Sequence, residues 1–152
     1  MKNTLLFFTI LLSFTSSYAQ NDNPKYDASL AQQLGADEYG MKNYVFALLK
    51  TGTNTTTDKQ FIADCFAGHM TNIAKLANAK KLIVAGPMGK NEVNLRGIFI
   101  LNVATIEEAN QLLETDPAIK AKLLTAEVFP WYGSAALPEY LPYHDKVWKK
   151  NH

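Results

Sequence analysis

The chain has 152 residues, of which 47% are hydrophobic, and its formal net charge is +1. This size and composition predict one compact globular domain. A net charge so close to zero gives no electrostatic reason to expect binding to nucleic acid or to an anionic membrane surface. Cys65 is the only cysteine, so the chain cannot form an intrachain disulfide.

The first 19 residues have the features of a secretory signal peptide. Lys2 precedes an apolar run from Leu5 to Phe14, and small and polar residues then lead to Ala19. Cleavage is expected after Ala19. The run of about ten residues is short against the roughly 20 that a membrane span needs, although an uncleaved anchor is the alternative. The sequence therefore predicts export to the periplasm or the extracellular space, with no membrane attachment after cleavage.

Residues 20–40 are polar and form an expected leader, with a short helix from about Asp27 to Leu34. The apolar run from Tyr44 to Leu49 then predicts a buried strand. Thr57 and Gln60 have the spacing of a capping box, which predicts a helix from that point to about Lys80.

The next segments repeat this alternation of strand and helix. Residues 81–88 and 95–103 predict two strands, separated by a polar connection. Thr105 and Glu108 have capping-box spacing and predict a second helix over 105–115. Asp116 and Pro117 are favourable residues for the start of a short third helix. Residues 125–133 predict the last strand, and an aromatic tail follows it.

The order of elements predicts an α+β fold, a ferredoxin-like βαββαβ sandwich over residues 41–132, with a C-terminal tail over 133–152. The strand segments "YVFALL", "LIVAG" and "GIFILNV" are apolar on both faces. Helices cover one face of such a sheet, so a second copy of the chain is expected to cover the other. The sequence thus predicts a homodimer, although the leader and tail could instead fold over the open face of a monomer.

His69 is the first candidate for chemistry. Phe66, His69, Ile73 and Leu76 share one face of the expected helix, so the imidazole lies in an apolar seam. A lone histidine there is often an ordinary buried residue. A neighbouring carboxylate would instead favour its charged form, and the pair could act as a general acid or base.

Asp116 is the candidate carboxylate. An Asp-Pro pair at a helix start is good capping chemistry by itself. Asp116 could cap the helix and also orient a histidine, because one carboxylate oxygen can accept from the helix amides while the other binds the imidazole. Gly86 and Pro87 end a strand abruptly and could let a ligand approach its end. Arg96 could bind an acidic substrate or lie at a solvated edge.

The residues give no sign of a cofactor site. The three histidines, at positions 69, 144 and 152, are too scattered to nominate a metal site. The sequence has no phosphate-binding glycine loop, nucleophile elbow or dinucleotide fingerprint. We therefore expect no metal and no organic cofactor.

The motifs together resemble the YCII-related domain of the dimeric α+β barrel superfamily. The resemblance covers about Tyr44 to Trp131 and depends on "FAGHMTNIAKLANAKKLIVAGPMG" and "LRGIFILNVATIEEANQLLETDPAIKAKLLTAEVFPWY". It implies a dimeric α+β barrel, with His69 and Asp116 as a catalytic dyad near the dimer interface and Gly86-Pro87 at its turn. It also implies cofactor-free acid/base chemistry on small unsaturated acids. The expected leader and aromatic tail depart from the simple domain and could cover the mouth of the pocket.

Two functions follow as hypotheses. The first is an acid/base enzyme of the isomerase or lyase type, acting on a small organic acid or lactone through His69 and Asp116. The second is a module on the same barrel that binds a small molecule or a protein without catalysis. A haem-binding barrel with His69 as axial ligand is supported only by analogy within the superfamily.

Overall fold

The computed structural model describes residues 23–144 and 146–149. The expected signal peptide lies outside these residues. Among the described residues, no helix is long and apolar enough to span a membrane. The elements, in chain order, are α1 (Ala28–Leu34), β1 (Met41–Thr51), α2 (Lys59–Asn78), β2 (Leu82–Pro87), β3 (Leu95–Leu101), α3 (Ile106–Leu113), α4 (Pro117–Lys120), β4 (Leu124–Ser134), the 3-10 helix η1 (Leu137–Tyr140) and α5 (Leu141–His144).

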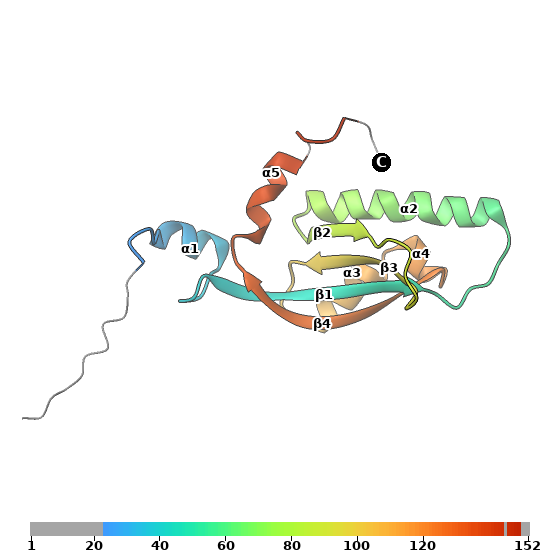
Figure 1. Ribbon diagram of the computed structural model, residues 1–152, viewed down its shortest axis with the longest axis horizontal. Coiled ribbons are helices and arrows are strands. Elements are labelled where there is room, and N and C mark those ends of the chain that lie inside the picture. The colour runs from blue at the N-terminus through green and yellow to red at the C-terminus, as the bar shows by residue number, and fades with distance from the viewer. Residues whose placement is uncertain (1–22, 145, 150–152) are drawn as a thin grey trace, which may run out of the picture.

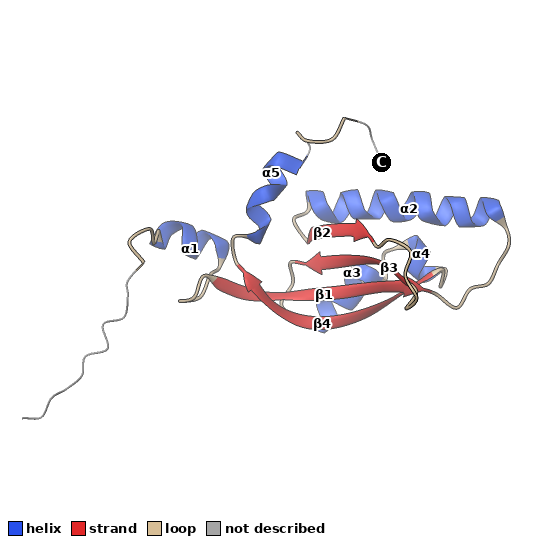
Figure 2. Ribbon diagram, viewed as in Figure 1, coloured by secondary structure: helices blue, strands red, loops and turns tan. Residues whose placement is uncertain are grey.

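The four strands form one antiparallel sheet with the order β2-β3-β1-β4. Helix α2 connects β1 to β2, and α3 with α4 connects β3 to β4. In Figure 1, α2 runs beside β2 while α3 and α4 lie behind the sheet, and Figure 2 shows the separate layers of strands and helices. The predicted ferredoxin-like βαββαβ fold is therefore confirmed.

The core lies between the sheet and these helices. Alternate residues of the two central strands point to the helices, since successive side chains of a strand face opposite sides. Removal of this apolar surface from water is the main favourable contribution to folding. The core residues are Val45, Ala47, Leu49, Leu76, Leu82, Phe99, Leu101, Val103, Ala109, Leu113, Ala118 and Leu124.

The predicted start of the long helix is wrong by one residue. Asp58, not Thr57, caps α2, and its side chain accepts hydrogen bonds from the amides of Gln60 and Phe61. Aspartate is the better cap, because its carboxylate accepts from two orphan amides and carries a negative charge at the helix start. The other predicted cap is confirmed, since Thr105 accepts from the amide of Glu108.

The second face of the sheet is also apolar. Register puts Phe46 opposite Phe129 and Ile100, and Leu48 opposite Ile98. Phe129 is 45% exposed, and the other four are half-buried. These five residues are called the open face below. The leader helix α1 has no buried residue, and residues of the C-terminal segment line a pocket beneath α2 instead.

Candidate active site

His69 and Asp116 meet although 47 residues separate them in sequence. Nδ1 of His69 lies 2.6 Å from Oδ2 of Asp116. Asp116 is fully buried and His69 is 9% exposed, so little water competes for this hydrogen bond. A bond to an ionised partner is short and strong in such surroundings.

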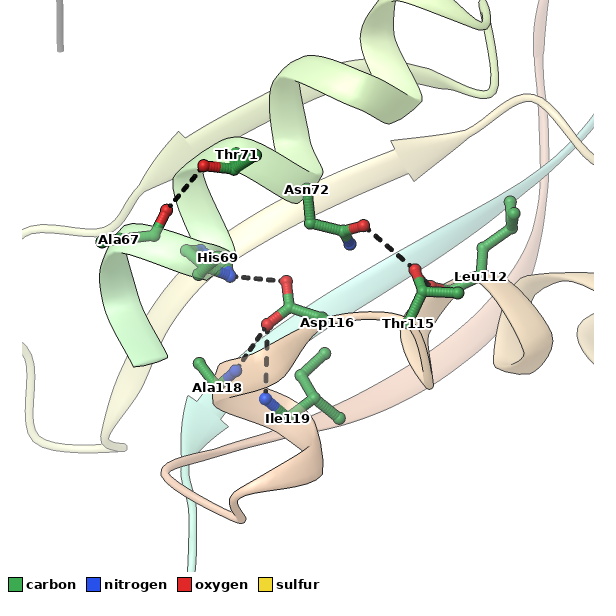
Figure 3. A network of polar contacts seen from close by, with 9 residues as sticks. All are labelled: Ala67, His69, Thr71, Asn72, Leu112, Thr115, Asp116, Ala118 and Ile119. Atoms are coloured by element: carbon green, nitrogen blue, oxygen red, sulfur yellow. Dashed lines mark hydrogen bonds and ion pairs between the residues drawn. The ribbon is translucent and has the colours of Figure 1, made fainter. Parts of the chain in front are cut away.

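The second oxygen of Asp116 holds the carboxylate in place. Oδ1 accepts hydrogen bonds from the amides of Ala118 and Ile119, at 2.9 and 3.3 Å. Figure 3 shows Asp116 between the imidazole of His69 and the first turn of α4. Asp116 therefore caps α4 and binds His69 at the same time, as its two oxygens allow.

Gly68 lets the two helices approach closely enough for this contact. A Cβ atom at Gly68 would lie 2.7 Å from Cγ of Pro117, which is closer than carbon atoms normally pack. Gly68 precedes His69 on α2, and Pro117 follows Asp116 on α4. The absence of a side chain at Gly68 thus brings the histidine to its carboxylate.

Two aromatic rings frame the imidazole. The ring of Phe99 is nearly parallel to that of His69, with centroids 6.0 Å apart, and the ring of Phe66 is nearly perpendicular to it, with centroids 6.1 Å apart. Together with the bond to Asp116, these contacts restrict the ring to one orientation.

His69 lies on the wall of a pocket of about 440 Å³. This volume is within the range of small-molecule sites, roughly 300 to 1,000 Å³. The lining is mostly apolar and comes from α2, the sheet and the C-terminal segment. The lining residues are Leu49, Phe66, His69, Met70, Ile73, Ala77, Leu82, Ile83, Ala85, Gly86, Pro87, Arg96, Gly97, Phe99, Leu124, Tyr140, Leu141 and His144.

The other predicted site residues line the same pocket. Gly86 and Pro87 end β2, and Arg96 stands near the start of β3 opposite them. The Arg96 side chain is exposed, although β3 is an inner strand of the sheet, and it lines the pocket. Asp116 binds Nδ1 of His69 and does not itself line the pocket.

Two shifts in strand register occur beside the pocket. Between β1 and β3 the shift makes Arg96 the extra residue, and between β2 and β3 it makes Ile83 the extra residue. Such bulges turn a side chain away from its regular direction and are frequent near functional sites. Arg96 lines the pocket together with Gly97, and Ile83 lines it together with Leu82.

The sequence suggested that the tail could cover the mouth of the pocket, but it did not indicate which residues contribute. Tyr140, Leu141 and His144 line the pocket, and the hydroxyl of Tyr140 donates a hydrogen bond to the carbonyl of Ile83. The aromatic residues of this segment were its only signal, since it has no clear helical or strand period.

A second polar contact between α2 and the end of α3 was also missed. Asn72 is 8% exposed, and the hydroxyl of Thr115 donates to its Oδ1 at 3.1 Å. Asn72 follows His69 by one helical turn, and Thr115 precedes Asp116. This contact supports the alignment of the two helices. Among the described residues, no group of three or more His, Cys, Asp or Glu side chains is arranged to hold a metal ion.

No protein-family profile matches the chain, and no curated protein matches it either. One similar solved structure is 5-chloro-2-hydroxyhydroquinone dehydrochlorinase from Burkholderia phenoliruptrix AC1100, in complex with 2,5-dihydroxybenzoquinone. The two proteins are 23% identical, the match covers 57% of this chain and 92% of the other, and the TM-score is 0.42. Membership of the YCII-related family thus stays a prediction.

Proposed function

We propose that the chain is an exported, cofactor-free acid/base enzyme of the isomerase or lyase type, which acts on a small organic acid or lactone. In this proposal His69 is the general acid/base, and Asp116 orients its ring and stabilises the charged form. Gly86, Pro87 and Arg96 bind the substrate. The observation that carries the proposal is the buried 2.6 Å hydrogen bond between His69 and Asp116 at the wall of a pocket.

The bond to Asp116 determines which nitrogen of His69 does the chemistry. A carboxylate at Nδ1 favours the tautomer with its proton on Nδ1, which leaves the lone pair on Nε2. Nε2 removes a proton from a carbon next to a carboxyl or carbonyl group of the substrate, and the C–H electron pair enters the double-bond system. The imidazolium then returns the proton to another carbon, which is isomerisation. In elimination a leaving group departs with an electron pair instead, and the imidazolium gives its proton to that group or to water.

The charges around the pocket favour an anionic substrate. Arg96 brings a permanent positive charge, and His69 becomes positive when it takes up a proton from the substrate. Among the described lining residues there is no aspartate or glutamate. A carboxylate would therefore be attracted to Arg96, whose guanidinium can bind it through two parallel hydrogen bonds, while the nearby carboxylate of Asp116 is separated from the pocket by the His69 ring.

Proton exchange gives a direct test, because it does not require the natural substrate. The protein is incubated in D₂O with a panel of small unsaturated acids and lactones, and loss of the α-proton signal is followed by ¹H NMR. We expect His69→Gln to slow the exchange by about 10² to 10⁴-fold, the usual contribution of a general base. Asp58→Asn is the matched control and should leave the rate unchanged.

The same experiment separates catalysis from simple binding. If panel members bind to the wild type and to His69→Gln with equal affinity and neither protein exchanges a proton, the acid/base proposal is wrong. The non-catalytic binding module would then be the better description of this pocket.

The second part of the proposal is a homodimer joined through the open face. The five residues Phe46, Leu48, Ile98, Ile100 and Phe129 present apolar side chains on the face opposite the helices. A continuous apolar surface of this kind is unusual on a monomer. A second copy, packed face to face about a two-fold axis, covers it with a surface of the same chemistry.

Light scattering at micromolar concentration tests the dimer. We expect twice the monomer mass for the wild type and the monomer mass for Phe129→Glu, which buries a charge in the proposed interface. Phe61→Glu is the matched control, because Phe61 is 41% exposed but lies on α2. A monomeric wild type would contradict the dimer.

A further inference from the structure

The C-terminal segment Leu137–His144, which comprises η1 and α5, forms one end of the pocket. Tyr140, Leu141 and His144 line it. The rings of Tyr140 and His144 are nearly perpendicular, with centroids 6.3 Å apart. Part of the pocket wall therefore comes from a segment outside the βαββαβ unit.

A hydrogen bond fastens this segment to the edge of the sheet. The hydroxyl of Tyr140 donates to the carbonyl of Ile83, and burial raises the pKa of Tyr140, which keeps the hydroxyl protonated. Ile83 is the extra residue of the register shift on β2. A bulged residue is left out of the regular ladder, so its carbonyl is available to Tyr140.

The positive end of the pocket lies at the other end of the same strand. The carbonyl of Arg96 accepts a hydrogen bond from the amide of Met88, next to the end of β2. Ile83 and Met88 are five residues apart, which corresponds to about 16 Å at about 3.3 Å per residue. The Tyr140 anchor and Arg96 therefore stand at opposite ends of the pocket.

The wall between these ends is almost entirely apolar. Its side chains include Ile73 and Ala77 of α2, Ala85 of β2 and Phe99 of β3. His69 is the only titratable group among the described lining residues that lies between Arg96 and the C-terminal segment. A ligand that fills the pocket would therefore meet a permanent charge at one end and mostly apolar side chains along its length.

We propose that the segment Leu137–His144 is the specificity wall of this pocket, and that the pocket selects an elongated monocarboxylate. The carboxylate lies at Arg96, the chain passes His69, and the apolar end contacts Leu141 and the rings of Tyr140 and His144. This inference rests on the proposed function, because it takes this pocket as the substrate site. It narrows the class of substrate to unbranched or flat acids that are long enough to reach the C-terminal segment.

Linear alkanoates test the wall, because they vary only in length. Dissociation constants of butanoate, hexanoate and octanoate are measured by NMR titration with the full chain. Each added methylene should tighten binding by about two- to four-fold in the wild type, as burial of a methylene predicts. Leu141→Trp fills the end of the pocket and should weaken octanoate at least about ten-fold while butanoate is unchanged.

Two further variants test the two ends separately. Arg96→Gln should weaken all three acids by the same factor, because every one of them places its carboxylate there. Tyr143→Ala is the control within the same segment, since Tyr143 is 63% exposed and does not line the pocket. Leu141 and Tyr143 lie on a short helix without buried residues, so neither change should unfold the protein.

The proposal is overturned if affinity does not rise with chain length, if Leu141→Trp affects all lengths equally or none, or if none of the acids binds. These experiments measure the affinity for the acids and do not require the protein to convert them. His69→Gln should retain the dependence on length, so failure of the acid/base proposal and failure of the specificity wall give different results.

Discussion

Asp116 and Asp37 use their carboxylates in the same way at two distant points of the molecule. Oδ1 of Asp116 accepts from the amides of Ala118 and Ile119, and Oδ2 binds His69. Oδ1 of Asp37 accepts from the amides that follow it in the turn before β1, and Oδ2 accepts from the hydroxyl of Tyr132. In each case one oxygen holds the local backbone and the other binds a side chain far away in sequence.

The surroundings of the two carboxylates differ. Asp116 is fully buried beside a pocket, whereas Asp37 is exposed and joins the leader to β4. Water competes with every contact of Asp37, so its bonds contribute little to stability. An aspartate that joins two parts of a chain is therefore no sign of a site by itself. Burial and a pocket next to the partner distinguish Asp116.

Removal of the buried carboxylate should have the largest effect. Asp116→Ala loses the cap of α4 and leaves His69 without its partner, which should lower the free energy of unfolding by about 2–4 kcal/mol. Asp58→Ala loses a cap alone and should cost about 1 kcal/mol. Urea denaturation measures both variants. Equal losses would mean that the bond to His69 adds nothing to the stability.

Gly68→Ala should separate the two helices that bring His69 and Asp116 together. Alanine normally favours a helix by about 1 kcal/mol over glycine. Here its Cβ would meet Pro117 at 2.7 Å, and we expect a net loss of about 1–2 kcal/mol from overpacking. The ¹⁵N shifts of the His69 ring should move as well. Gly86→Ala is the control, because nothing lies within 4 Å of the added Cβ.

Asp116→Asn should change the chemistry of His69 more than the stability. Asparagine caps a helix about as well as aspartate, so the loss of stability should be within about 1 kcal/mol of that in Asp58→Asn. The side-chain amide introduced by this substitution can donate to Nδ1 of His69, which would shift the ring proton to Nε2. The ring ¹⁵N shifts distinguish the tautomers. Unchanged shifts would exclude an orienting role for the carboxylate.

Asp37→Asn should have the smallest effect on stability and a clear effect on one pKa. The hydrogen bond to Asp37 raises the pKa of Tyr132 to about 12 and lowers the pKa of Asp37 itself. In Asp37→Asn, ¹³C NMR of the tyrosine rings should therefore show Tyr132 titrating closer to the ordinary value of 10. A pKa of Tyr132 that stays at about 12 in the variant would contradict this cause.

The signs of these two shifts define a pH window for the contact. Because the pKa of Asp37 is lowered on folding, its contribution is present above the ordinary value of 3.8 and is lost as the pH falls. Because the pKa of Tyr132 is raised, its contribution is present below 10 and is lost as the pH rises through about 12. The leader should stay fastened to β4 between these limits.

The elements of the βαββαβ unit were predictable because each carries a local signal. Apolar runs marked the strands, and the 3.6-residue spacing around His69 marked the face of α2 that contacts the sheet. Asp116 with Pro117 marked the start of α4. The cap at Asp58 was missed by one residue because Thr57 also fits the local pattern, and only the backbone geometry distinguishes them.

The complete pocket was not predictable from such signals. The meeting of His69 and Asp116 depends on Gly68, whose role is visible only when α4 is in place. The C-terminal wall depends on an irregular segment without periodicity. The register shifts at Ile83 and Arg96 are features of pairing between strands, and a sequence read along one strand does not contain them.

These two register shifts also have a genetic meaning. In each ladder a single pair lies on one side of the shift and the remaining pairs follow regularly on the other, so Ile83 and Arg96 resemble insertions of one amino acid into an ordinary ladder. A change of one codon in length can thus add a side chain to the pocket without reversing the faces of the neighbouring residues. Length variation in β2 and β3 is therefore a route by which descendants of this gene could acquire a different ligand.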